Sequence, residues 1–156
     1  MRRVSFIHLH SNVMSTWNPL LRALVRNPFS ESELSLLVSH LHEVTDMGST
    51  ALHFAALRRD ARFVLFLLQQ EGIQADTINF YGETALHWAV KADREQVVTL
   101  LLASGAQADF SDSQGASPID WASEEGHFHL LPLLRRDPCL SSSLLQGCID
   151  SIRERT

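Results

Sequence analysis

The sequence predicts an all-α solenoid of about four helix pairs, joined by turns and finger-like loops. The first observation is a glycine that recurs at a nearly constant spacing, at Gly48, Gly82 and Gly115. The second is the tetrapeptide Thr-Ala-Leu-His behind the first two glycines, and the third is an apolar run at a fixed distance behind each copy. A period of this length indicates stacked helical repeats, each of which buries its apolar faces against its neighbours.

Each unit is predicted to contain a turn, a short helix, a tight turn, a longer apolar helix and a loop. Glycine suits the first turn, which needs a positive φ or a close backbone approach. Thr50, Thr84 and Ser117 stand just before apolar-periodic runs, where a helix N-cap is expected. Small alanines on the first helix allow the second helix to pack closely against it. The second helices are expected around the apolar runs Phe63–Leu68, Val97–Leu102 and Leu130–Leu134.

The period divides the chain into six segments. Two stretches before the first clear copy indicate a capping helix pair, and Ser143–Arg155 indicates a helix that closes the other end of the stack. The expected boundaries are a basic extension at 1–16, a capping pair or degenerate repeat at 17–45, repeats at 46–78 and 79–111, a degenerate repeat at 112–136, and a tail or capping helix at 137–156.

The third copy departs from the pattern of the first two. Ser117 and Asp120 replace the threonine and histidine of the tetrapeptide. Pro132 is expected inside the second helix, where it would remove a backbone hydrogen bond and kink the helix. Such departures are typical of the terminal repeat of a stack.

These motifs resemble those of ankyrin-repeat proteins. The two G-x-T-A-L-H-x-A stretches are similar to the family's G-x-T-P-L-H-x-A, and residues 100–106, Leu-Leu-Leu-Ala-Ser-Gly-Ala, are similar to its L-L-L-x-x-G-A. The resemblance covers residues 46–136, more than half of the chain. It implies that the tetrapeptide residues tie the first helix to adjacent turns by hydrogen bonds. The residues with this expected structural role are Thr50, His53, Thr84, His87, Ser117 and Asp120.

The resemblance also implies where a partner binds. In this family the loops and the exposed ends of the first helices form the usual recognition surface. Phe80 and Tyr81 stand at an expected loop tip, and exposed aromatic residues are enriched among interface hot spots. The expected protein-binding residues are Met47, Leu57, Arg58, Phe80, Tyr81, Glu83, Lys91, Phe110, Gln114 and Glu124.

The charge distribution indicates the class of partner. Residues 1–41 carry a net charge of +2, residues 42–134 carry −8, and residues 135–156 carry +1. The acidic middle disfavours nucleic acid, because binding to phosphates requires clustered lysine and arginine. It favours a partner protein with a basic segment. No apolar run is long enough to cross a bilayer, so a membrane is not expected to be a partner.

The sequence contains none of the common catalytic motifs, such as a Walker loop, a Gly-x-Ser-x-Gly elbow or a Cys-x-x-Cys pair. We therefore expect no enzyme and no cofactor, but a monomeric, non-catalytic adaptor or inhibitor in the cytoplasm or nucleus. A mitochondrial location is an alternative, because the first thirty residues contain four arginines and no acid. Two alternative functions are an inhibitor that masks a basic segment of a transcription factor and a metal-binding protein. The metal hypothesis depends on three His-x-His pairs, at 8/10, 40/42 and 127/129.

Overall fold

The structure is a computed structural model that describes residues 42, 44–59 and 61–135. The predicted extension at 1–16 and the tail at 137–156 lie outside the described residues. So does the predicted capping pair at 17–45, apart from residues 42, 44 and 45. The helices of the described part are α4 (Ala51–Ala56), α5 (Ala61–Leu68), α6 (Ala85–Lys91), α7 (Glu95–Ala103), α8 (Pro118–Glu124), the short 3₁₀ helix η1 (Phe128–Leu130) and α9 (Leu131–Leu134).

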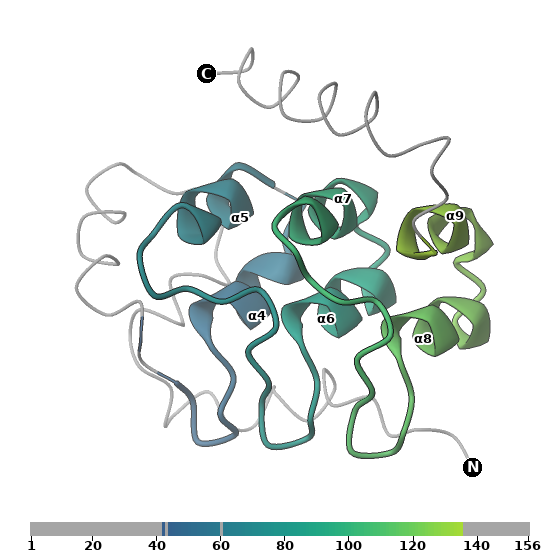
Figure 1. Cartoon of the computed structure of the whole chain (residues 1–156), viewed down its shortest axis with the longest axis horizontal. Helices are drawn as coiled ribbons and strands as arrows, with labels where there is room; N and C mark the ends of the chain where they lie inside the picture. The colour runs from purple at the N-terminus through teal and green to yellow at the C-terminus, as the bar shows by residue number, and fades with distance from the viewer. Residues whose placement is uncertain (1–41, 43, 60, 136–156) are drawn as a thin grey trace.

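The helices form two parallel rows. Helices α4, α6 and α8 lie side by side in an inner row, and α5, α7 and α9 lie side by side in an outer row (Figure 1). The loops that precede the inner helices project away from both rows on the same side (Figure 1). The described residues contain helices and no strand, which confirms the all-α repeat fold. They contain three helix pairs; the fourth pair of the prediction falls outside them.

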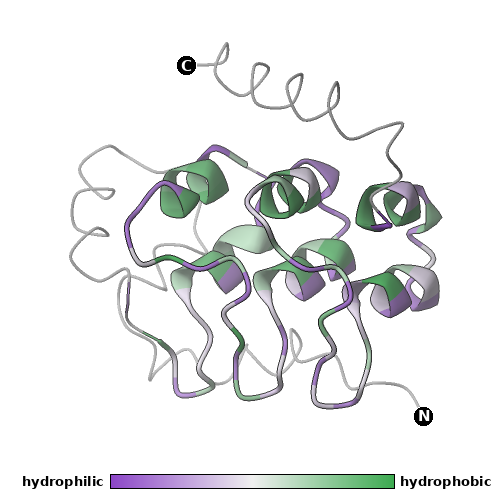
Figure 2. Ribbon diagram, in the orientation of Figure 1, coloured by the Kyte–Doolittle hydropathy of each residue, from purple (hydrophilic) through white to green (hydrophobic). Residues whose placement is uncertain are grey.

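The core lies between the rows and between neighbouring pairs. Ala55, Ala89 and Ala122, which occupy the same position in successive inner helices, are completely buried. A methyl side chain at this position lets helix axes approach closely, so larger apolar residues such as Leu67 and Leu101 fill the space from the outer row. Figure 2 shows that the inner helices are hydrophobic toward the outer row and hydrophilic on the opposite side, which faces the projecting loops.

The outer helix of the third repeat differs from the prediction. Pro132 was expected to interrupt this helix from within; instead, η1 ends at Leu130 and α9 begins at Leu131. Pro132 therefore lies in the first turn of α9, where a backbone N–H has no partner within the helix. The expected kink is wrong, because the chain starts a new helix one residue before the proline.

Candidate interaction surface on the finger loops

Three tight loops present the candidate site, and we call them finger 1 (residues 45–49), finger 2 (residues 79–83) and finger 3 (residues 112–116). Each is closed by a hydrogen bond from the backbone N–H of its first residue to the carbonyl of its last, at 3.0, 3.0 and 2.9 Å. The fourth residue of each finger is a glycine with φ between +70° and +79°. Other residues rarely adopt this conformation, which explains why glycine recurs with the period of the repeat.

A side chain at the first position of each of the last two fingers holds the turn. In finger 2, the Asn79 Oδ1 accepts hydrogen bonds from the backbone N–H groups of Tyr81 and Glu83, at 2.9 and 3.0 Å. In finger 3, the Asp112 Oδ1 accepts the equivalent bonds from Gln114 and Ala116, at 2.8 and 3.0 Å. These local bonds satisfy backbone donors that would otherwise need water, so the finger conformation is specified by short-range chemistry.

Successive fingers are joined by their backbones. The N–H of Phe80 in finger 2 donates to the carbonyl of Met47 in finger 1 at 2.9 Å. The N–H of Ser113 in finger 3 donates to the carbonyl of Tyr81 in finger 2, also at 2.9 Å. Each finger tip is therefore held by its neighbour, and the three tips form one continuous surface.

Apolar side chains gather at the tips of fingers 1 and 2. Phe80 is 76% exposed, although its ring lies against Gly48. The Tyr81 hydroxyl lies 3.6 Å from the Met47 sulfur, so the part-buried Tyr81 lies beside finger 1. We call Met47, Phe80 and Tyr81 the finger-tip cluster. The structure thus brings together three of the residues predicted to bind a partner.

Glu83 was predicted to bind a partner, and the structure places it in the interior instead. It is buried, and its Oε2 accepts hydrogen bonds from the Trp88 indole N–H at 2.8 Å and from the Asn79 amide at 2.9 Å. Its carboxylate is thus occupied inside the repeat, because the indole N–H needs an acceptor when it is removed from water. Arg58, also predicted at the surface, is buried as well. The expectation that these two side chains are exposed to a partner is wrong.

The other predicted binding residues lie at two separate places. Phe110 is part-buried at the approach to finger 3, and Gln114 is exposed at its tip. Lys91 and Glu124 lie at the ends of α6 and α8, and part-buried Leu57 follows α4. The Lys91 ammonium lies 4.9 Å from the centre of the Trp121 ring, a cation–π distance. These helix-end residues line the inner row rather than the finger tips.

The repeated Thr-Ala-Leu-His motif links each inner helix to the next finger. The Nδ1 of His53 accepts the backbone N–H of Thr50 at 3.1 Å and lies 3.0 Å from the Thr50 hydroxyl. Because Nδ1 is an acceptor, the neutral ring carries its proton on Nε2, which donates to the Glu83 carbonyl at 2.9 Å. His87 bonds to Thr84 and to the Ala116 carbonyl in the same way, at 3.1 and 3.2 Å.

Burial keeps the His53 ring neutral. Desolvation lowers the pKa of His53 below its ordinary value of 6.5, and the nearby Glu83 carbonyl and carboxylate act in the opposite direction. Protonation of Nδ1 would also remove the acceptor for the Thr50 N–H, because both nitrogens of a charged imidazole are donors. The link between the first and second repeats therefore depends on the neutral ring.

The third repeat uses the same positions differently. The Asp120 Oδ2 accepts hydrogen bonds from the backbone N–H of Ser117 at 2.9 Å and from its hydroxyl at 2.7 Å. The N–H of Asp120 donates to the Ser117 Oγ at 3.3 Å, which completes a reciprocal capping box. Asp120 is exposed and closes its own helix end.

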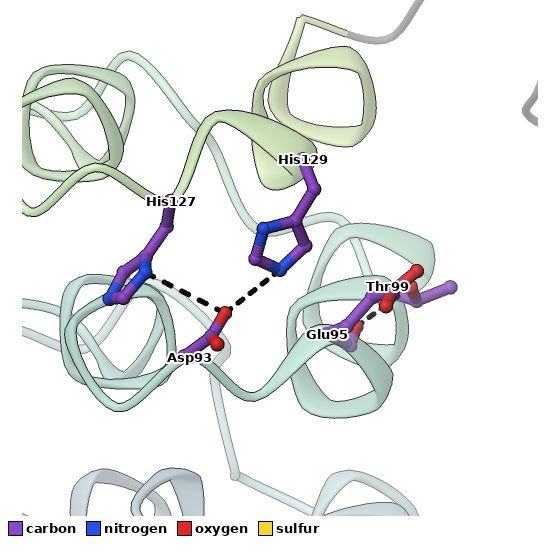
Figure 3. Close-up of polar contacts among 5 residues, drawn as sticks. All are labelled: Asp93, Glu95, Thr99, His127 and His129. Carbon is purple, nitrogen blue, oxygen red and sulfur yellow. Dashed lines mark hydrogen bonds and ion pairs between the residues drawn. The ribbon is translucent and has the colours of Figure 1, made fainter.

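The carboxylate of Asp93, in the second repeat, lies close to His127 and His129 of the third repeat. The Asp93 Oδ1 lies 2.9 Å from the His129 Nε2 and 3.8 Å from the His127 Nδ1 (Figure 3). The sequence did not indicate this cluster, because Asp93 is a whole repeat away from the two histidines along the chain. Asp93 has a φ of +57° and lies in the turn between α6 and α7, so the stacking of the repeats brings it to η1. Among the described residues, no group of three potential ligands is placed to hold a metal ion.

Within residues 42, 44–59 and 61–135, none of the helices has the length and apolar character needed to cross a membrane.

Comparison with protein families identifies the repeat. A family model described as ankyrin repeats, in three copies, matches residues 62–140, just over half of the chain. The matched segment contains fingers 2 and 3 and helices α6 to α9. None of the curated proteins matches the chain.

Proposed function

The chain belongs to the ankyrin-repeat family, whose repeats are generally protein–protein interaction modules, and we propose that it is a non-catalytic adaptor or inhibitor. In this proposal, a partner protein binds across the finger tips and the face of the inner helices beside them. The finger-tip cluster supplies the apolar anchor of the interface. The polar inner-helix ends, which include Lys91 and Glu124, form its rim.

The exposure of Phe80 is the observation that carries the proposal. Leaving an aromatic side chain 76% exposed forgoes the free energy that its burial would gain. Phe80 stands on a turn that is closed by its own backbone bond, braced by Asn79 and bonded to Met47. An anchor on a rigid loop loses little conformational entropy when a partner covers it. Large aromatic side chains in this situation often dominate binding energy.

A basic partner segment is the second part of the proposal. Residues 95–134 contain six acidic residues and no lysine or arginine. Five of the six are exposed; Asp112 is the buried exception. An excess of exposed acidic residues attracts a positively charged segment and raises its association rate. An inhibitor that masks a basic segment of a transcription factor is one form of this proposal, and steep weakening of binding by salt would favour it.

The test compares two exposed phenylalanines. Partner proteins are captured from lysate with the wild-type chain, identified by mass spectrometry and prepared for titration. We expect Phe80→Ala to weaken binding of the identified partner at least tenfold. Phe128→Ala is the matched control, because Phe128 is 64% exposed but lies on η1, away from the fingers. The control is expected to leave affinity unchanged.

Two outcomes would contradict the proposed site. The first is equal binding by the Phe80→Ala variant and the wild type, which would move the interface away from the finger-tip cluster. The second is a large fall in melting temperature for Phe80→Ala, which would show that the ring is part of the folded core. Circular dichroism melts of all three proteins distinguish a lost contact from a lost fold.

A further inference from the structure

The glycine of finger 3 differs in its surroundings from the glycines of fingers 1 and 2. A Cβ atom built on Gly48 would lie 2.8 Å from the Phe80 ring, and one on Gly82 would lie 2.8 Å from the Ser113 nitrogen. In both cases the next finger fills the space beside the glycine. A Cβ atom on Gly115 would meet none of the described atoms within 4 Å. Finger 3 therefore keeps the same turn, with φ of +79°, beside a space that the described residues leave open.

In fingers 1 and 2, one backbone carbonyl accepts a hydrogen bond from the next finger, and finger 3 has a carbonyl at the equivalent position. The carbonyl of the third finger residue is Met47 in finger 1 and Tyr81 in finger 2, and each accepts the N–H of the next finger. The equivalent carbonyl of finger 3 belongs to Gln114, which is exposed. Among the described residues, none donates a backbone hydrogen bond to it. Within the described part of the chain, the finger-to-finger hydrogen bonds therefore end at finger 3, with the carbonyl of the exposed Gln114.

A histidine joins α4 to finger 2, and an equivalent histidine joins α6 to finger 3. The third repeat has Asp120 at this position, and the Asp120 carboxylate caps its own helix end. The features that finger 3 shares with fingers 1 and 2 are the carbonyl of its third residue, Gln114, and the glycine after it, and an extended segment can contact both.

The surroundings of finger 3 indicate the charge of that segment. Asp109 precedes the finger and Asp120 follows it, and both are exposed. Residues 95–134 contain no lysine or arginine, and the Lys91 ammonium of the second repeat lies over the Trp121 ring. An extended segment with lysine or arginine on either side of its bonding residue would complement this charge.

We propose that the edge of finger 3 at Gln114 and Gly115 binds an extended, basic segment of a partner protein by backbone addition. One N–H of the segment donates to the Gln114 carbonyl, and the side chain of the same residue covers Gly115, as Phe80 covers Gly48. An aromatic residue fits this position, since the equivalent site in finger 1 holds one. This inference rests on the proposed function and adds to it a second contact, one finger beyond the finger-tip cluster.

The test uses a peptide based on the protein's own second finger. The probe copies residues 77–82 and places a lysine at each end, where the protein has Asp76 and Glu83. It is titrated into the ¹⁵N-labelled full chain while backbone amide shifts are recorded. Saturable shifts are expected at Gln114 and Gly115. A control peptide carries an N-methyl group on the phenylalanine nitrogen, and it should bind about five- to tenfold more weakly, because one net hydrogen bond is lost.

A matched pair of protein variants tests the site. Gly115→Asn places a side chain in the open space, and asparagine tolerates the left-handed backbone. Gly126→Asn is the control, because Gly126 has a φ of +80° and an equally open position between α8 and η1. We expect Gly115→Asn to weaken peptide binding about tenfold, and Gly126→Asn to leave it unchanged.

Several outcomes would overturn the inference. Shifts confined to Phe80 and Met47, equal binding of the N-methylated peptide, or the absence of saturable binding would each do so. Titration of the captured partner separates this inference from the proposed function. If Phe80→Ala weakens partner binding and Gly115→Asn does not, the partner binds at the finger-tip cluster and the proposed contact at the edge of finger 3 is wrong. The reverse result would support the contact at finger 3 and contradict binding at the finger-tip cluster.

Discussion

In the second repeat the third residue of the inner helix is His87, and in the third repeat it is Asp120. His87 is fully buried and bonds both to its own helix end and to the carbonyl of Ala116 in the next finger. Asp120 is exposed, and its carboxylate caps the helix through Ser117. An imidazole has two nitrogens on opposite sides of a ring, so it joins two repeats. A carboxylate at the same position serves the cap of its own helix.

The two repeats also hold their tryptophans differently. In the second repeat, Asn79 braces the finger while Glu83 accepts the Trp88 indole N–H. In the third repeat, Asp112 does both: Oδ1 braces the finger, and Oδ2 accepts the Trp121 indole N–H at 3.1 Å. The same bonds thus form from two different residue sets. Hydrogen-bonding requirements are kept from repeat to repeat, whereas the residues that meet them are interchangeable.

The largest expected effect separates the linking histidine from the capping aspartate. His87→Ala should lower the free energy of unfolding by about 3 kcal/mol, because it leaves a cavity and removes one of the two hydrogen bonds that the buried Ala116 carbonyl accepts; the other comes from the Asp112 N–H. Asp120→Ala should cost about 1 kcal/mol, the usual effect of losing a helix cap. Urea denaturation of both variants gives the two values. Equal losses would show that the histidine is only a cap.

The second prediction transfers the arrangement of the second repeat into the third. Asp112→Asn should lower the free energy of unfolding by about 2 kcal/mol, because the Trp121 N–H then loses its carboxylate acceptor. Adding Ala116→Glu should restore at least half of that loss, since Ala116 occupies the position that Glu83 has in finger 2. Chemical denaturation of the single and double variants provides the measurement. A double variant no more stable than Asp112→Asn would show that the two sites are not equivalent.

The third and smallest prediction concerns acid. The folded chain lowers the pKa of His53, so the unfolded chain binds more protons at pH values below about 6.5. The free energy of unfolding should therefore fall as the pH drops below 6.5, by no more than about 1.4 kcal/mol per pH unit for this histidine. Denaturation at pH 8.0, 7.0, 6.0 and 5.5 tests this range, in which carboxyl groups of ordinary pKa stay ionised.

The control for the acid prediction removes the titrating group. In His53→Ala the chain is less stable at every pH, but its stability should decline less steeply between pH 7.0 and 5.5. The link between the first and second repeats depends on the neutral His53, and the third repeat has a carboxylate at the equivalent position. An identical slope in the variant and the wild type would assign the pH dependence to other groups.

Local features of the fold were predictable from the sequence. Gly48, Gly82 and Gly115 marked turns because a positive φ favours glycine. Thr50, Thr84 and Ser117 marked helix starts because such residues favour the N-cap, and all three lie there in the structure. The Ser117 hydroxyl accepts the Asp120 N–H, whereas each threonine hydroxyl lies within hydrogen-bonding distance of the histidine Nδ1 three residues later. The position of Pro132 was predicted less well. A proline is tolerated or disruptive according to the residue at which its helix begins, and the apolar pattern did not define that residue.

The candidate site was only partly predictable. Phe80, Tyr81 and Met47 were expected at the loops, and the structure places them together at the tips of two fingers. Glu83 was expected at the surface because loops at its position form the usual recognition surface of the family, yet its carboxylate lies inside, where it accepts the indole N–H of Trp88. A sequence shows that both residues are present, but not that one turn brings them within bonding distance.

The sequence by itself determined the period, the turns, the helix starts and the family, because each of these follows from short-range chemistry that recurs once in every repeat. Only the tertiary structure decided which residues are buried and which meet across repeats. It placed Asp93 against His129, left Phe80 exposed on Gly48 and kept the space beside Gly115 open among the described residues. These contacts join residues of neighbouring repeats that are far apart along the chain, and their geometry is set by how the repeats stack.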